Sequence, residues 1–222
     1  VLVLSAFIAT FNETILNVAL SNIMEDFNIS SGTAQWIITG YMIITSVMVP
    51  ITAFLIESFR TKQIFLGAMT LLLIGTILCA ISNSFPMLLI SRMVQAAGTG
   101  MMIPIMMNTI LIVSPKEKIG SYMSICICAI TLGPAFSPTI SGIMLQYFSW
   151  HVLFIALIPI LILITILGAC TLSDVSKLTY PKLDFLSVIL STLGLASLIY
   201  GINIISSGNI KAITISLLLG II

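Results

Sequence analysis

The sequence predicts an all-helical bundle that crosses a membrane several times. Charged residues make up 7% of the chain, against roughly 25% in ordinary soluble domains. They are also excluded from long apolar runs, and a helix needs about 20 residues to cross the hydrocarbon core of a bilayer. The runs without Asp, Glu, Lys or Arg are 27–56, 63–91, 93–115, 119–173 and 185–210. Most of them hold one helix, and the longest holds two.

Eight spans are expected in order along the chain. Each is an apolar stretch that ends at a polar or basic loop, as in helices joined at a membrane surface. They are 1–20, 34–56, 63–81, 86–112, 121–145, 151–171, 184–204 and a last one from Ile210 onward. The chain starts without Met and stops inside the last apolar run, which predicts a fragment of a longer protein.

The basic residues predict which helix ends face the cytoplasm. Short cytoplasmic loops collect Lys and Arg, and here the cations occur in alternate loops. These loops carry Arg60 and Lys62, then Lys116 and Lys118, then Lys177 and Lys182. The loops between them carry only Lys211, so we expect the N-terminus to lie in the cytoplasm.

Polar residues form one stripe on the otherwise apolar first helix. Glu13 and Asn17 lie about one turn apart, and Thr10, Thr14 and Ser21 continue the stripe at helical spacing. Polar groups at membrane depth mark ion or substrate pathways. Glu13 is therefore a candidate proton carrier and Asn17 a candidate substrate contact. The alternative is that Glu13 only holds two helices together.

Arg92 is the only charged residue in the apolar stretch 63–115. Gln95 and Thr99 follow at offsets of three and seven, so they share its face of the fourth helix. At 1.5 Å per residue, Glu13 and Arg92 both lie on the order of 10 Å from the outer surface, and the two can meet. We expect Glu13 to take up and release a proton while Arg92 biases its charge state, with Gln95 and Thr99 in the substrate cavity.

Met102 and Met106 lie on the Arg92 side of the fourth helix. Methionine is flexible and polarizable, which suits a surface that accepts dissimilar apolar ligands. Both are candidate substrate contacts, and filling of the core is the alternative.

The fifth helix carries a seam of small residues, Gly133, Ser137 and Ser141, one at every fourth position. Such a seam lets another helix approach closely. Pro138 within it invites a bend, because proline removes a backbone donor. A transport role and simple packing both fit this pattern.

The cysteines and the single histidine indicate neither a disulfide framework nor a metal site. All four cysteines lie within or at the end of predicted spans, and His151 has no carboxylate or cysteine beside it. We expect no metal and no cofactor, and a membrane enzyme is the weakest hypothesis. His151, Trp36, Tyr147 and Trp150 are expected at the membrane interface, where amphipathic rings prefer to lie.

Taken together, these motifs resemble the major facilitator superfamily, in particular its fourteen-span drug:proton antiporters and the lincomycin-resistance-type multidrug exporters of Gram-positive bacteria. Residues 12–20 are similar to the signature L-D-x-T-I-V-N-V-A-L, with Asn12 at the usual Asp and Glu13 beside it. Arg92 and Gln95 resemble the pattern R-x-x-Q-G, whose arginine is assigned to proton coupling. The antiporter pattern G-x-x-x-G-P-x-x-G-G is similar to Gly133, Ser137, Pro138, Ser141 and Gly142.

The resemblance covers essentially the whole chain. The loop after the second helix resembles the cytoplasmic gate G-x-L-A-D-R-x-G-R-R, which makes Glu57 and Lys62 gating candidates. Residues 181–203 resemble the start of the two extra helices of fourteen-span members. The domains implied are a six-helix bundle over 1–171, a cytoplasmic loop over 172–183, and linker helices seven and partial eight over 184–222.

The resemblance implies a transporter that exports amphipathic drugs by alternating access, driven by the proton gradient. Helices one to three and four to six are expected to be inverted repeats. The implied partners are small amphipathic substrates, protons, the lipid bilayer and a C-terminal half of the same protein, with no nucleic acid. The implied location is the plasma membrane of a Gram-positive bacterium. Export of a physiological solute such as a peptide, lipid or metabolite is the alternative.

Overall fold

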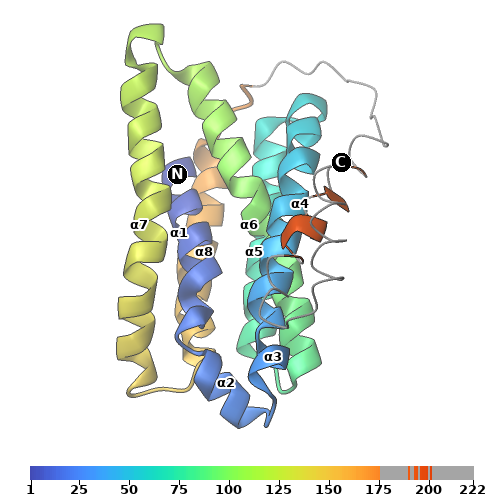
Figure 1. Ribbon diagram of the computed structural model, residues 1–222. Helices are drawn as coiled ribbons and strands as arrows, with labels where there is room; N and C mark the ends of the chain where they lie inside the picture. Colours follow the sequence, from blue (N-terminus) through green and yellow to red (C-terminus); the bar gives the residue numbers. More distant parts are fainter. Residues whose placement is uncertain (176–189, 191–192, 195, 200, 202–222) are drawn as a thin grey trace.

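The computed structural model describes residues 1–175, 190, 193–194, 196–199 and 201 (Figure 1). Helices make up nearly all of residues 1–175, and short turns join them. In chain order they are α1 (Leu2–Thr14), η1 (Ile15–Asn17), α2 (Leu20–Asp26), α3 (Ser31–Ala34), α4 (Trp36–Ser58), α5 (Thr61–Ala80), α6 (Phe85–Val113), η2 (Lys116–Lys118), α7 (Ile119–Leu145) and α8 (His151–Thr171).

The long helices confirm the second to sixth predicted spans. Within the described residues, 5 helices are long and apolar enough to cross a membrane, or up to 6 if the first, bent pair counts as one span. These are α4 (with the short α3 before it), α5, α6, α7 and α8. The predicted span 184–204 and the one after it lie almost entirely outside the described residues.

The first span differs from the continuous helix predicted over 1–20. α1 ends at Thr14, a short 3₁₀ turn follows, and α2 leaves at an angle of 54° (Figure 1). No proline or glycine lies at the break, so the usual covalent cause of a kink is absent. The side chain of Arg92, from another helix, binds the carbonyl groups of Asn12 and Glu13 in the last turn of α1, just before the 3₁₀ turn.

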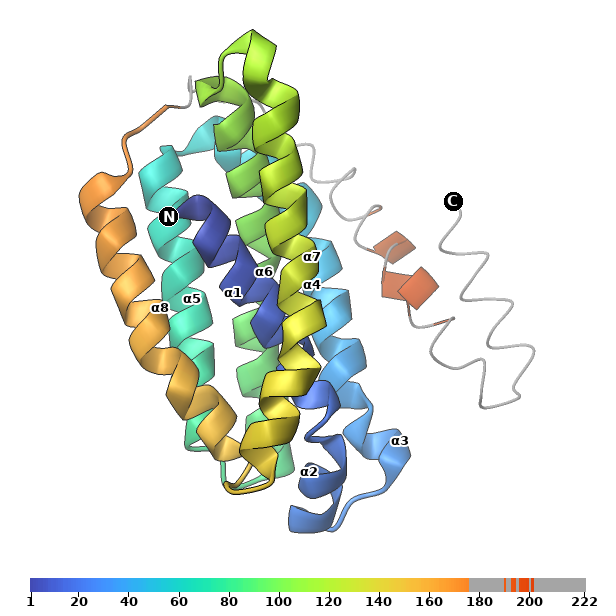
Figure 2. The ribbon, with the colours of Figure 1, turned by 90° about the vertical axis from the view of Figure 1, so that its left-hand side faces the viewer.

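One pair of helix contacts has the symmetry expected of inverted repeats. α1 packs on α7 and α6 packs on α4, while α5 packs on both α6 and α8. If the triplet α1, α4 and α5 corresponds to the triplet α6, α7 and α8, then α1 corresponds to α6 and α4 to α7. The contact of α1 with α7 then corresponds to the contact of α6 with α4. Figure 2 shows α1 inside the bundle, with α7 on one side and α5 and α8 on the other.

Small residues lie where the helix axes come closest. Gly98 of α6 faces α5, and a Cβ atom added there would lie 2.5 Å from the carbonyl oxygen of Ala68. Gly133 of α7 faces α1, where an added Cβ would overlap the side chain of Thr10. Ser137 and Ser141 continue the buried stripe of α7, and the Ser141 hydroxyl donates to the Ser137 carbonyl. The predicted seam therefore lies against α1.

The two ends of the bundle differ in charge. The loop between α4 and α5 and the loop between α6 and α7 carry Arg60, Lys62, Lys116 and Lys118. Both loops lie at one end, and α2 lies at the other (Figure 1). α2 carries the two acidic residues Glu25 and Asp26.

Candidate functional site

A cluster of buried polar side chains lies inside the bundle. It comprises Asn12 of α1, Tyr41 of α4, Thr76 of α5, and Arg92, Gln95 and Thr99 of α6, and we call it the Arg92 cluster. Each of these residues is at most 1% exposed. Buried polar groups require partners, and four helices that otherwise present apolar surfaces supply them here.

The α6 members of the cluster share one face of their helix, as the sequence predicts. Residues three and seven positions apart lie on one side of a helix, so Arg92, Gln95 and Thr99 all point toward the interior. Nη1 of Arg92 donates to Oε1 of Gln95 at 2.6 Å. This bond between neighbours on one helix fixes the direction of the guanidinium.

The guanidinium of Arg92 binds the end of α1. Nη1 donates to the carbonyl oxygen of Asn12 at 3.2 Å, and Nη2 donates to that of Glu13 at 3.1 Å. Carbonyl groups in the last turn of a helix have no partner within the helix, and this end also carries the negative pole of the helix dipole. Arg92 thus satisfies both needs and stabilises the break in the first span.

Gln95 joins three helices. Its Nε2 atom donates to Oδ1 of Asn12 at 3.1 Å and to Oγ1 of Thr76 at 2.8 Å. Asn12 occupies the position where the related signature has Asp, so the side chain at that position lies within the cluster. Asn12 Nδ2 and Arg92 Nε are buried and have no hydrogen-bond partner among the described residues.

Tyr41 forms the remaining wall of the cluster. The Cζ atom of Arg92 lies 4.0 Å from the centroid of the Tyr41 ring, within the range of a cation–π contact. The Tyr41 hydroxyl shares a hydrogen bond of 2.6 Å with Oγ1 of Thr99. Sequence analysis missed both Tyr41 and Thr76, because only the packing of α4 and α5 against α6 brings them to the arginine.

Glu13 lies beside Arg92, but their charged groups are not paired. The predicted proximity of the two residues is confirmed, since the guanidinium contacts the Glu13 backbone. Within residues 1–175 the half-buried Glu13 carboxylate makes no ion pair within 4.0 Å, and the coupling of the two opposite charges stays a prediction. Backbone carbonyl dipoles, an amide oxygen and an aromatic ring surround the cation instead.

The remaining cavity candidates occupy different environments. Asn17 is exposed in the turn that follows α1. Met102 and Met106 are buried among the apolar residues of the core, which is the packing position that sequence analysis gave as the alternative. A role for them as substrate contacts therefore stays a prediction that this arrangement does not favour.

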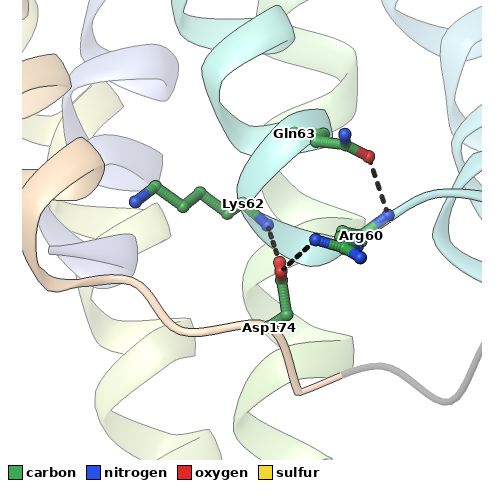
Figure 3. A network of polar contacts seen from close by, with 4 residues as sticks. All are labelled: Arg60, Lys62, Gln63 and Asp174. Atoms are coloured by element: carbon green, nitrogen blue, oxygen red, sulfur yellow. Dashed lines mark hydrogen bonds and ion pairs between the residues drawn. The ribbon is translucent and has the colours of Figure 1, made fainter.

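The loop between α4 and α5 is held by a residue that sequence analysis missed. Asp174, which follows α8, accepts a hydrogen bond from the backbone N–H of Lys62 at 3.2 Å and lies 3.8 Å from Nη1 of Arg60 (Figure 3). A carboxylate at the first turn of a helix stabilises its free N–H groups. Lys62 thus takes part through its backbone, and its side chain points away from Asp174 in Figure 3. In the described residues Glu57 forms no ion pair.

The aromatic residues at the opposite end behave in two ways. Tyr147 is exposed and Trp36 partly so, as interfacial rings are expected to be. Trp150 is buried instead, and its Nε1 donates to Oδ2 of Asp26 at 3.1 Å. His151 stacks on Trp150, and its Nε2 lies 2.9 Å from the Ser82 carbonyl oxygen. For Trp150, the expectation of an interfacial anchor is therefore wrong.

Comparison with known proteins places these features in a family context. Residues 2–222 match the family model described as Major Facilitator Superfamily. The chain is 39% identical over its full length to an uncharacterized MFS-type transporter, YcnB, of Bacillus subtilis, covering 48% of that protein. It is 37% identical over its full length to the lincomycin resistance protein LmrB of Bacillus subtilis, covering 47% of it. The chain thus spans about half the length of these relatives.

Solved structures share the arrangement of helices. A peptide transporter, POT, in complex with sulfate superposes with a TM-score of 0.68 at 16% identity, over 90% of this chain and 51% of that one. The human organic anion transporter MFSD10 (TETRAN) also gives a TM-score of 0.68, at 14% identity, over 89% of this chain and 53% of that one. At such identities the likeness concerns the fold alone.

Proposed function

Because this chain belongs to the Major Facilitator Superfamily, we propose that it forms the first half of a proton-coupled exporter of amphipathic drugs that works by alternating access. The resemblance seen in the sequence, Asn12 to Leu20 above all, agrees with this membership. The protein is a multi-pass membrane protein. We infer further that its basic loops and its N-terminus face the cytoplasm, since these loops gather at one end of the bundle.

The observation that carries the proposal is the position of Arg92 at the end of α1. Burying a cation without a paired carboxylate costs free energy. Here the buried cation is Arg92, and it donates a hydrogen bond to the backbone carbonyl of Glu13. A half-exposed carboxyl group next to a fixed positive charge can exchange its proton with water on whichever side the cavity opens. In this proposal Glu13 carries the proton and Arg92 provides the charge that favours its release.

Alternating access connects this proton to the substrate. With the cavity open outward, Glu13 binds a proton and drug leaves. With the cavity open inward, the proton departs as drug enters. The break between α1 and α2 lies directly beyond Glu13 and gives the first span a place to bend. The seam of α7 packs on the same helix, so a movement of α1 is passed to α7 through close backbone contact.

The substrate class rests on relatives, and it is proposed on that basis alone. Two relatives at 37% and 40% identity are named lincomycin resistance proteins, from Bacillus subtilis and Listeria monocytogenes. The chain covers 47% and 42% of these proteins, so the substrate-binding surface of a second half lies outside this chain. We therefore propose lincomycin as the first substrate to examine, with the fluorescent dye ethidium as a probe for the broader export of amphipathic drugs.

Transport in inverted membrane vesicles tests the proposal. The full-length protein should accumulate ethidium or lincomycin when the vesicle interior is made acidic. Glu13→Gln should abolish accumulation driven by the gradient while exchange of drug down its own gradient continues. Glu25→Gln, which alters an exposed carboxylate of α2, is the matched control and should transport normally.

Two outcomes would contradict the proposal. Full gradient-driven accumulation by Glu13→Gln would remove Glu13 from proton coupling. Failure of the folded, unmodified protein to accumulate either compound would favour export of a physiological solute by the same fold.

A further inference from the structure

The charge of Arg92 is held in place by groups that carry no negative charge. Its Nη atoms bind the carbonyl oxygens of Asn12 and Glu13 and the amide oxygen of Gln95. These contacts lie along the edge of the guanidinium. The Cζ atom at its centre lies over the ring of Tyr41, 4.0 Å from the centroid. Tyr41 therefore contacts the cation from a side where it makes no hydrogen bond.

The ring of Tyr41 is itself fixed. The residue is 1% exposed, and its hydroxyl shares a 2.6 Å hydrogen bond with Thr99. Thr99 lies two helical turns beyond Arg92 on the same face of α6. The Tyr41 ring thus contacts α6 at two points, the guanidinium of Arg92 and the hydroxyl of Thr99. These two contacts fix the orientation of the ring relative to the guanidinium.

From this arrangement we propose that Tyr41 is a positioning residue for proton transfer: its ring holds Arg92 on the end of α1 and away from the Glu13 carboxylate. The inference rests on the proposed role of Glu13 as the proton carrier. An aromatic face stabilises a cation without competing for its proton or pairing with it as a carboxylate does. Arg92 then stays in place whether Glu13 is protonated or ionised, and Glu13 is left free to exchange its proton.

Removal of the ring has a definite consequence. Arg92 loses the support on its face and turns to the nearest negative group, which is the Glu13 carboxylate. An opposite charge at close range favours the ionised form of a carboxyl group. Glu13 then binds a proton only at lower pH. The other titratable groups near Arg92 are Tyr41 of α4 and Cys79 of α5, and both are uncharged in the acidic and neutral range, because phenols and thiols lose their protons only at higher pH.

Infrared titration of the purified full-length protein tests this inference without any substrate. The carbonyl stretching band of the protonated Glu13 carboxyl is identified as the band that Glu13→Gln removes. In Tyr41→Met the midpoint of this band should fall by about one pH unit, a tenfold loss of proton affinity. In Tyr41→Phe, which keeps the ring, the midpoint should remain close to that of the unmodified protein. Tyr147→Leu, at an exposed tyrosine, is the matched control.

The outcomes separate the two claims. An unchanged midpoint in folded Tyr41→Met would overturn the role of Tyr41, and so would an equal shift in Tyr41→Phe. Tyr41→Leu provides a second ring-free variant if Tyr41→Met does not fold, as judged by size-exclusion chromatography. If Glu13→Gln removes no band that titrates, the proposed proton site fails, whatever the variants of Tyr41 show.

Discussion

The side-chain amide of Gln95 donates to the side-chain oxygen of Asn12 at 3.1 Å, and this bond joins α6 to α1 inside the bundle. The same nitrogen also donates to Thr76, so a single amide ties three helices together. These buried polar groups lie on different helices, and each needs the others as hydrogen-bond partners. The consequences can be measured on the full-length protein.

Asn12→Leu should destabilise the protein by about 1–3 kcal/mol, because the buried amide of Gln95 loses one of its two acceptors. The measurement is thermal or denaturant unfolding in detergent. Asn17→Leu is the control: Asn17 is exposed, and the change there should stay within about 0.5 kcal/mol. Equal destabilisation by both variants would show that the contact of Asn12 with Gln95 contributes nothing specific.

An acidic residue at position 12 should take over the task of Glu13. The Asn12 side chain reaches Gln95, and its backbone oxygen is bound by Arg92. A carboxylate introduced there lies within the Arg92 cluster. Asn12→Asp combined with Glu13→Gln should therefore restore the gradient-driven drug accumulation that Glu13→Gln alone loses. Vesicle transport measures the recovery, and no recovery in a folded double variant would mean that the position of the carboxyl group on α1 matters more than its presence.

Gly133→Ala should destabilise the contact of α7 with α1 by about 1–3 kcal/mol, the usual cost of forcing an extra carbon into a packed contact. The added carbon would meet the side chain of Thr10 and the backbone of Phe7 and Phe11. Gly142→Ala is the matched control, since nothing lies within 4 Å of a Cβ atom built there. Comparison of unfolding midpoints decides the matter, and similar midpoints for both variants would contradict close contact at Gly133.

Asp174→Ala should loosen the first turn of α5, because it removes both the hydrogen bond to the Lys62 N–H and the ion pair with Arg60. The expected loss is about 0.5–1 kcal/mol, since the pair is partly exposed and such pairs contribute little. Asp174→Asn keeps an acceptor and should lose less than Asp174→Ala. Hydrogen–deuterium exchange at the start of α5 reports both effects.

A control for that measurement is Glu117→Gln, which changes an exposed acidic residue in η2. It should leave exchange in α5 unchanged. Faster exchange in Asp174→Asn than in Asp174→Ala would contradict the assignment of Asp174 as the cap of α5.

Part of the Arg92 cluster can be predicted from the sequence because it depends on one helix. Arg92, Gln95 and Thr99 share a face of α6 by helical periodicity alone. The depth argument that brings Glu13 to Arg92 needs only the rise per residue and the position of the loops. The seam of Gly133, likewise, follows from a spacing of four.

The rest depends on how separate helices meet, and no local pattern in the sequence contains that information. Tyr41 and Thr76 lie in largely apolar helices without a charged residue near them, so only their packing on α6 distinguishes them. The end of α1 at Thr14 has no proline or glycine to predict it, and Arg92, which binds the carbonyl groups there, lies 79 or 80 residues further along the chain. Asp174 contacts Lys62 across 112 residues.

α1 and α6 are the first helices of the two triplets, yet they differ in length and continuity. α6 runs unbroken for 29 residues, whereas α1 stops after 13 and the chain then turns by 54°. The two triplets therefore share an order of helices but differ in continuity: the first span changes direction between Asn17 and Leu20, whereas α6 is one helix from Phe85 to Val113.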